Sequence, residues 1–313
     1  MTKATPAHRT ARPSGFTLIE VTVAIVLSGI LATVIFQLLQ GQSRFTDSQT
    51  GRQAVQENVR GAMELIASEL RAVPAAAIVQ AGAHSMRLRV PRAYGTLCTP
   101  MGAGAGAAWV ALPPKTMPAD LPTTGTLAAT HWGIAVPAAA PGVVQAGRVT
   151  QVSTAGGAPC NANLRLNGAD VDEVNVTYTG LATAVATSDA APVRVFLFQE
   201  IEYSVGQSSV TGAQSDWLMR ANATVGGAVS TPQPLAGPLL PDHEGSNIGG
   251  VTFRYFCDTA ERTPAQATAT PNAIDKVRVV LAMRSRDRGT NTVQQLADST
   301  TIHLRNSETA CTP

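Results

Sequence analysis

The spacing of apolar and polar residues divides the N-terminal part of the chain into two helical segments. The 19 residues from Val21 to Leu39 carry no charge, and as a helix they would span about 28 Å, close to the hydrocarbon thickness of a bilayer. After a polar interruption at residues 40–43, apolar residues recur at steps of three and four, the stripe of an amphipathic helix. These residues are Val55, Val59, Met63, Ile66, Leu70 and Val73. We predict one helix from about Phe16 to Val73, ended by Pro74.

Beyond residue 74 the pattern changes to the alternation that is typical of β-strands. The strands that this alternation predicts are Met86–Val90, Val174–Tyr178, Val193–Val205, Trp217–Ala221, Gly250–Phe256, Val277–Arg284 and Val293–Leu304. The last two are separated by a polar turn and predict a hairpin. Because no long helical pattern alternates with these strands, a parallel doubly wound sheet is disfavoured. The predicted fold is α+β: a long N-terminal helix, hydrophobic in its first half and amphipathic in its second, packed on a largely antiparallel β-sheet head.

Several segments of the head give weaker predictions. Residues 75–82 have the composition of a linker, and the glycine-rich residues 101–107 predict a flexible loop, since no GK[ST] follows that would make a phosphate loop. Residues 109–152 contain short apolar pieces that are edge strands or ordered loops. Arg87 and Arg89 alternate with apolar residues, which favours a solvated strand face over the alternative of a partner-facing surface.

The net charge of the whole chain is misleading, because part of the positive charge lies in the N-terminal leader. The chain has 23 basic and 21 acidic residues, but Lys3, Arg9 and Arg12 lie before the apolar segment. Without these three, 20 basic residues face 21 acidic ones, so the net charge gives no reason to expect a nucleic-acid partner. A cationic leader of this kind stays in the cytoplasm by the positive-inside rule, and the C-terminal bulk crosses the membrane.

One carboxylate, Glu20, lies at the start of the apolar segment. An ionised carboxylate in hydrocarbon costs roughly 2.5 kcal/mol or more, so Glu20 needs a function or a partner. The residues around it, Gly15-Phe16-Thr17-Leu18-Ile19-Glu20, with the later step Gly29-Ile30-Leu31-Ala32, resemble the prepilin signal of type IV pilins and pseudopilins. The resemblance implies cleavage after Gly15, methylation of Phe16, and pairing of Glu20 with the N-terminal amine of a neighbouring subunit.

The resemblance also implies an organisation of the whole chain. Residues 1–15 would be the leader peptide, residues 16–73 the transmembrane and assembly helix, and residues 74–313 the exported head. The expected location is the inner membrane, crossed once, with a cytoplasmic N-terminus and a periplasmic head, and afterwards a pilus or pseudopilus. The implied partners are other pilin or pseudopilin subunits, the prepilin peptidase and the inner-membrane assembly platform.

The size of the head and three of its strands indicate a subgroup of the family. A head of 240 residues is large for a repeating subunit, which favours a minor pilin or pseudopilin at the tip or in initiation. The segments Asp216–Arg220 and Val251–Phe256 and the closing hairpin resemble J-type pseudopilins and large minor pilins. The alternatives are an adhesin or ligand-binding head that uses pilin-type export, and, less favoured, a membrane-anchored enzyme.

Four cysteines in an exported head permit two disulfides. They are Cys98, Cys160, Cys257 and Cys311, too far apart in sequence for a zinc knuckle. The pairs Cys98–Cys160 and Cys257–Cys311 are slightly preferred over the other two pairings, because shorter loops close at lower entropic cost.

The sequence contains no motif that calls for catalysis. Its five histidines are scattered, without the spacing of metal ligands. Asp170, Asp172 and Glu173 could contribute to a calcium site, but they lack the other ligands of an EF-hand loop, so a solvated turn is favoured. Asp242, His243 and Glu244 have no nucleophile motif nearby. We therefore expect no enzyme activity, no metal and no cofactor.

Overall fold

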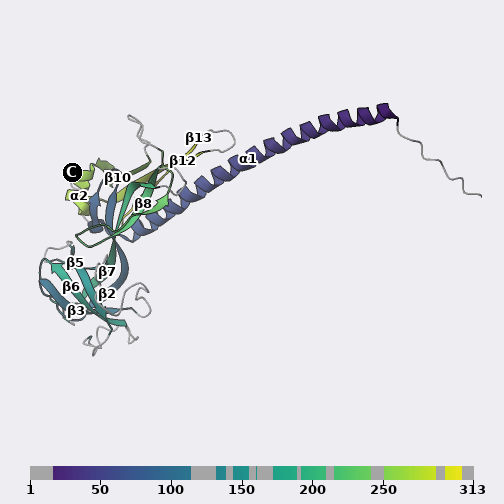
Figure 1. Ribbon diagram of the computed structural model, residues 1–313. Helices are drawn as coiled ribbons and strands as arrows, with labels where there is room; N and C mark the ends of the chain where they lie inside the picture. Colours follow the sequence, from purple (N-terminus) through teal and green to yellow (C-terminus); the bar gives the residue numbers. More distant parts are fainter. Residues whose placement is uncertain are drawn as a thin grey trace, which may run out of the picture. The chain divides into compact units, whose positions relative to one another are not determined.

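The computed structural model describes residues 17–113, 132–138, 144–154, 160, 172–188, 192–208, 215–240, 250–286 and 293–304. Helix α1 (Leu18–Ala72) forms the N-terminal part, as Figure 1 shows. It is helical through Gly29 and Gly41 and ends two residues before Pro74, because a proline disfavours helical geometry at the residue before it. The predicted helix is thus confirmed, and its observed ends differ from the predicted ones by one or two residues.

The chain divides into two compact units, which are described separately. The first unit contains α1 through Arg52, and the residues of α1 from Leu18 to Asp47 are all exposed. The second unit contains the rest of α1 and the β-rich head.

The head is built from two antiparallel sheets. The larger one has nine strands in the order β1-β2-β3-β6-β5-β4-β7-β8-β9. These strands are β1 (Ile78–Ala81), β2 (Met86–Leu97), β3 (Gly104–Leu112), β4 (Trp132–Pro137), β5 (Val144–Ser153), β6 (Asp172–Leu181), β7 (Val193–Ser208), β8 (Ser215–Ala223) and β9 (Gln233–Ala236).

An additional pairing between β2 and β7 closes part of this sheet into a ring. The ring runs β2-β3-β6-β5-β4-β7 and back to β2, and is therefore a six-stranded barrel. Side chains fill its interior, as in other small barrels; the largest are Trp132 and Tyr178, both almost fully buried. Closure of the barrel leaves these six strands with fewer open edges, which protects them from pairing with other chains.

Strands β2 and β7 are long enough to take part in two hydrophobic cores. Their segments Ala93–Leu97 and Val195–Leu197 contribute to the barrel interior. Their segments Met86–Val90 and Ile201–Tyr203 contribute to a second core, against which α1 packs. The predicted stripe of α1 lies in this second core: Val59, Met63, Ile66, Leu70 and Val73 are buried, and Val55 is partly buried.

The second sheet completes the core that contains α1. Its strand order is β11-β10-β12-β13, formed by β10 (Val251–Cys257), β11 (Ala260–Arg262), β12 (Lys276–Arg286) and β13 (Val293–His303). Alternate residues of β10 and β12, such as Phe253 and Val279, point into the core. A short helix, α2 (Pro264–Ala269), begins with a capping box between Thr263 and Gln266. The α+β fold class and the antiparallel pairing of the head agree with the sequence prediction.

The predictions for residues 75–82 and 101–107 were wrong. Residues 75–77 form a turn of 3-10 helix, and Ile78–Ala81 form β1, paired with β2. Gly104–Ala107 belong to β3 rather than to a loop. The glycine at position 106 has a packing role there, since an added Cβ would lie 2.8 Å from the hydroxyl of Tyr178.

The segment from 109 to 152 contains parts of three barrel strands. Trp132–Pro137 form β4, which pairs with β5 on one side and β7 on the other, so it is not an edge strand. Gly133 makes room for a neighbouring side chain, because an added Cβ would lie 2.2 Å from the ring of Phe198. Short, glycine-containing strands of this kind carry a weak alternation and are therefore hard to recognise in the sequence.

Candidate assembly helix and its junction with the head

The residues of the predicted processing site, Gly15 and Phe16, are outside the described residues, which begin at position 17. Glu20 is in the first turn of α1. The backbone N–H of Glu20 donates to the carbonyl of Thr17 at 3.1 Å and to its hydroxyl at 3.4 Å. Thr17 thus caps the helix, and Glu20 occupies the position of the acidic residue in a capping box. The positive end of the helix dipole favours a carboxylate there.

Polar groups in the apolar half of α1 differ in whether they have partners. The hydroxyls of Thr22 and Thr33 donate to the carbonyls of Ile19 and Gly29, at 2.9 and 2.8 Å. These two side chains are satisfied within the helix and tolerate an apolar surrounding. The carboxylate of Glu20 has no partner among the residues that the structure describes. Because Glu20 is exposed, its carboxylate is accessible to a partner from another molecule.

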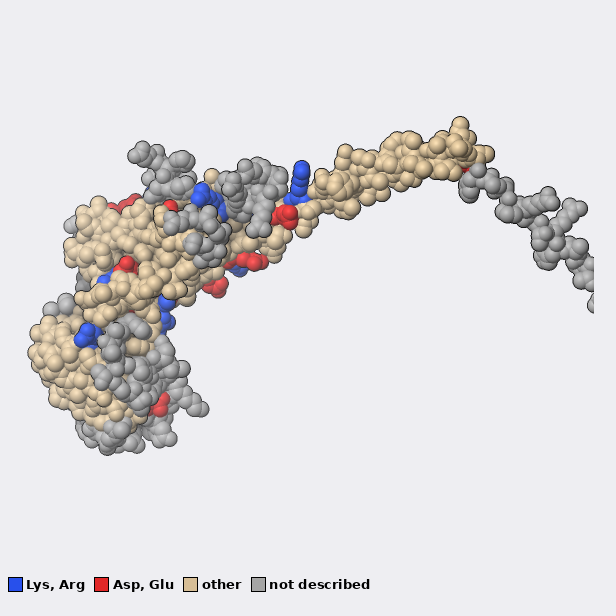
Figure 2. Space-filling view, in the orientation of Figure 1, with Lys and Arg blue, Asp and Glu red and all other residues tan. Residues whose placement is uncertain are grey.

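The first half of α1 exposes a continuous apolar surface. By length and composition α1 is able to cross a membrane, and none of its apolar window is buried within the chain. Leu27 and Phe36, for example, are 60% and 61% exposed. Figure 2 shows this part of the helix without charge except near its start. Burying one such side chain contributes roughly 1.5–3 kcal/mol, so this surface requires a lipid or protein surrounding.

At the other end of α1 a second carboxylate, Glu69, is buried at the junction with the head. It is 5% exposed, although it does not belong to the predicted apolar stripe of the helix. The hydroxyl of Tyr203 in β7 donates to one carboxylate oxygen, and the guanidinium groups of Arg220 in β8 and Arg92 in β2 donate to the other, at 2.8 and 3.3 Å. Three strands therefore hold one side chain of the helix.

The titration of this cluster reflects its burial. Burial raises the pKa of Tyr203, and the charge of Glu69 and the hydrogen bond to it raise that pKa further. Burial alone would lower the pKa of Arg220, but the hydrogen bond to Glu69 and its charge outweigh this effect and raise it. Glu69 and its partners thus form a hydrogen-bonded cluster in a largely apolar contact, in which only Nε of Arg220 is buried without a partner among the described residues.

A second buried carboxylate corrects the prediction for Arg87 and Arg89. Glu200 in β7 is fully buried and forms ion pairs with both arginines, at 3.4 Å to Arg89. The side chains of Arg87 and Arg89 are only 12% and 22% exposed, so this face is not a solvated one. Neither Glu69 nor Glu200 was identified from the sequence. The signal that could have indicated Glu69 is its spacing, three residues after Ile66 and four before Val73, which places it at the border of the apolar stripe.

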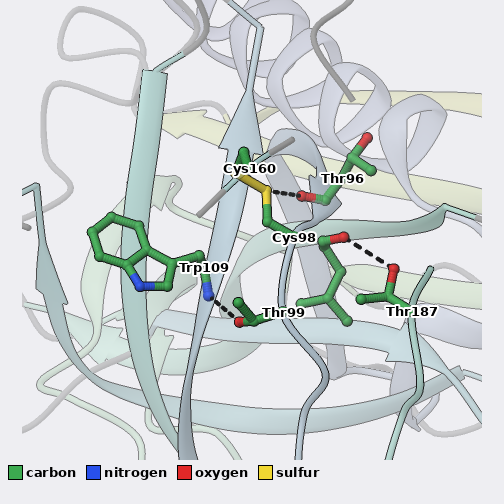
Figure 3. The surroundings of a disulfide bond; sticks show 7 residues. Thr96, Cys98, Thr99, Trp109, Cys160 and Thr187 are labelled. Carbon is green, nitrogen blue, oxygen red and sulfur yellow. Dashed lines mark hydrogen bonds between the residues drawn. A yellow bond between two sulfur atoms is a disulfide. The ribbon is translucent and has the colours of Figure 1, made fainter. Parts of the chain in front are cut away.

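One predicted disulfide is present in the head. Cys98 and Cys160 are bonded, with Cα atoms 5.0 Å apart, as Figure 3 shows. Hydrogen bonds hold the chain on both sides of Cys98: Thr187 donates to the carbonyl of Leu97, and the N–H of Trp109 donates to the hydroxyl of Thr99. Cys257 is also disulfide-bonded. Its predicted partner Cys311 lies outside the described residues, so the Cys257–Cys311 pairing stays a prediction.

The described residues offer no metal centre. No group of three His, Cys, Asp or Glu side chains suited to hold a metal ion occurs among them. Asp172 and Glu173 begin β6, while Asp170 and residues 242–244 lie outside the described residues. The calcium hypothesis is therefore untested.

Comparison with known proteins supports the interpretation of the N-terminus. Residues 11–36 match the family model of the prokaryotic N-terminal methylation motif. No match to the chain was found among curated proteins or among solved structures. The matched segment covers the Gly15–Phe16 junction, Glu20 and most of the apolar half of α1, as far as Phe36. The chain carries a type IV pilin-like prepilin signal, and this signal indicates a structural subunit that assembles with other pilin-type subunits after processing by a prepilin peptidase.

Proposed function

We propose that this chain is a minor pilin or pseudopilin, a structural subunit of a type IV pilus or of a type II secretion pseudopilus. One observation carries the proposal: the methylation motif coincides with an exposed apolar helix in which Glu20 lacks a partner among the described residues. In this proposal residues 1–15 are removed, residues 16–73 form the membrane and assembly helix, and residues 74–313 form the head.

The proposed orientation follows from the leader. Lys3, Arg9 and Arg12 keep the N-terminus in the cytoplasm and leave the head in the periplasm. Before assembly α1 crosses the inner membrane once, and during assembly the amine of Phe16 in one subunit meets Glu20 of another. The assembly platform in the inner membrane would extract the subunit at this step. An amine and a carboxylate lower each other's cost of burial when they pair.

A position at the tip, or a role in initiation, is supported by the size of the head. In addition to the sheet against which α1 packs, the head has a closed six-stranded barrel. If the subunit were repeated along a filament, a head of this size would have to be accommodated at every position. A subunit at the end of the filament has to be accommodated only once. The resemblance of residues 216–220, residues 251–256 and the β12–β13 segment to J-type pseudopilins points in the same direction.

A second candidate function is that of an exported adhesin or ligand-binding head. The observation that favours it is a cleft in the head, lined by two arginines, which is described in the next subsection. The two candidates differ in what α1 does, since a binding head needs it only as an anchor.

The test is fractionation of cells that contain a pilus or a type II secretion system. A structural subunit co-purifies with sheared filaments, and its N-terminal residue, determined by sequencing and intact mass, is a methylated Phe16. An anchored binding head stays in the membrane fraction. A mature chain that begins after residue 30, or an uncut Met1, would overturn the proposed processing.

A further inference from the structure

A cleft of about 310 Å³ opens on the outer surface of the head. One wall comes from β5 and β6, where Arg148 and Thr179 lie directly opposite each other in register. The other wall is the turn after β8, with Val225 and Gly226, and Arg89 of β2 completes the lining. This volume is at the lower end of the range for small-molecule sites.

Arg89 and the turn after β8 are held in place before any ligand binds. The guanidinium of Arg89 is paired with the buried Glu200 and lies over the ring of Phe198, 5.5 Å from its centroid. Arg87 donates to the carbonyls of Thr224 and Gly227, at 2.8 and 3.0 Å, and so fixes the turn that forms the second wall. Fixed donors lose little conformational entropy on binding, which favours affinity.

The charge of the lining is positive. Arg89 and Arg148 both line the cleft, and none of the other residues that line it is acidic. The charge of Arg89 is compensated by its ion pair with Glu200. Arg148, in contrast, is exposed and has no ion-pair or hydrogen-bond partner among the described residues. An unpaired guanidinium next to a second one is a site for an oxyanion.

We propose that this cleft binds a small oxyanion of the carboxylate class. Arg148 provides the principal charge-assisted hydrogen bonds, Arg89 provides a second, preorganised guanidinium, and the hydroxyl of Thr179 provides a neutral donor. The ligand is either a free organic acid or the carboxylate at the end of a peptide chain. The proposal is independent of filament assembly, because every group that it uses lies in the head.

The experiment is calorimetric titration of the full chain in detergent micelles with citrate, at a fixed ionic strength set by sodium chloride. Ionic strength must be fixed because salt screens exposed charges. Wild-type protein should bind citrate saturably. Arg148→Gln should bind citrate with an affinity lower by a factor of about ten or more, as expected for a lost charge-assisted hydrogen bond. Arg148 is exposed, so its replacement leaves the fold intact. A short peptide with a free carboxyl end, compared with its C-terminal amide, distinguishes a chain end from a free acid.

The matched control is Arg194→Gln. Arg194 is an exposed arginine at the start of β7 that does not line the cleft, and its replacement should change the affinity for citrate less than about twofold. Absence of saturable binding by the wild-type protein to both citrate and the free-carboxyl peptide would overturn the proposal. Equal losses in the two variants would do the same, because binding would then depend on net charge and not on the cleft.

Discussion

The two ends of α1 each carry one carboxylate in an apolar segment, and the two carboxylates have opposite environments. Glu69 is buried and accepts hydrogen bonds from Tyr203, Arg220 and Arg92. Glu20 is exposed and its carboxylate has no partner among the described residues. An apolar surrounding penalises an unpaired carboxylate. Glu69 is satisfied within its own chain, and in the proposed assembly Glu20 is satisfied by another subunit. In the proposed function, one helix thus carries an intramolecular contact at one end and an intermolecular contact at the other.

The apolar residues of α1 provide the largest expected contrast. Leu70 is fully buried in the core shared with the head, whereas Leu31 is 61% exposed. Leu70→Ala should lower the free energy of unfolding of the head by about 3 kcal/mol, through lost burial and a residual cavity. Leu31→Ala should change it by less than about 0.5 kcal/mol. Urea unfolding of the detergent-solubilised chain, followed by the fluorescence of its tryptophans, measures both. Equal effects would mean that the head does not depend on the second half of α1.

The same contrast applies to the charged residues. Glu69→Ala leaves Tyr203 and Arg220 without their shared partner, which should destabilise the head by about 2–3 kcal/mol, less than for a fully buried pair because Arg220 is partly exposed. Glu64→Ala removes an exposed carboxylate from the same helix and should have little effect. Unfolding in urea separates the two variants. A loss in Glu69→Ala no larger than that in Glu64→Ala would show that the cluster does not hold the helix.

A smaller effect is expected at alkaline pH. The folded pKa of Tyr203 is raised above the ordinary value of 10, so its contribution to stability is fully present below pH 10. Above pH 10 the unfolded chain loses the proton and the folded chain keeps it, so stability should fall by up to about 1.4 kcal/mol per pH unit. Tyr203→Phe should flatten this fall, as thermal melts at pH 9 to 11 would show. An unchanged slope in the variant would assign the fall to other groups, such as Tyr255.

The helix and many of the strands could be predicted from the sequence because their patterns are local. The stripe of Val59, Met63 and Ile66 follows the period of a helix, and the alternation in Val251–Phe256 follows that of a strand. Closure of the barrel could not be predicted, since it depends on pairing between β2 and β7, whose partners are far apart in sequence, from Leu97 and Val193 at one end to Met86 and Tyr203 at the other. The same holds for Glu69, whose partner Tyr203 is 134 residues away in sequence.

Glycine-rich segments are a second reason why some strands could not be predicted from the sequence. Residues 104–107 have the composition of a loop, yet they belong to β3, where Gly106 leaves space for Tyr178. The methylation motif differs from these cases, because it is short and contiguous and no tertiary contact is needed to recognise it. The roles predicted for Gly15, Phe16 and Glu20 follow from this motif.

The most direct test of the account is the incorporation of Glu20→Ala into sheared filaments at normal cellular abundance. The account predicts that the variant is inserted, cleaved after Gly15 and folded, with an unchanged melting temperature, and that it is lost from the filament fraction. Thr17→Ala is the matched control, because it removes the cap of α1 at a cost of about 1 kcal/mol but keeps the carboxylate, and it should still be incorporated. Incorporation of Glu20→Ala at the wild-type level would contradict the account and leave α1 as an anchor.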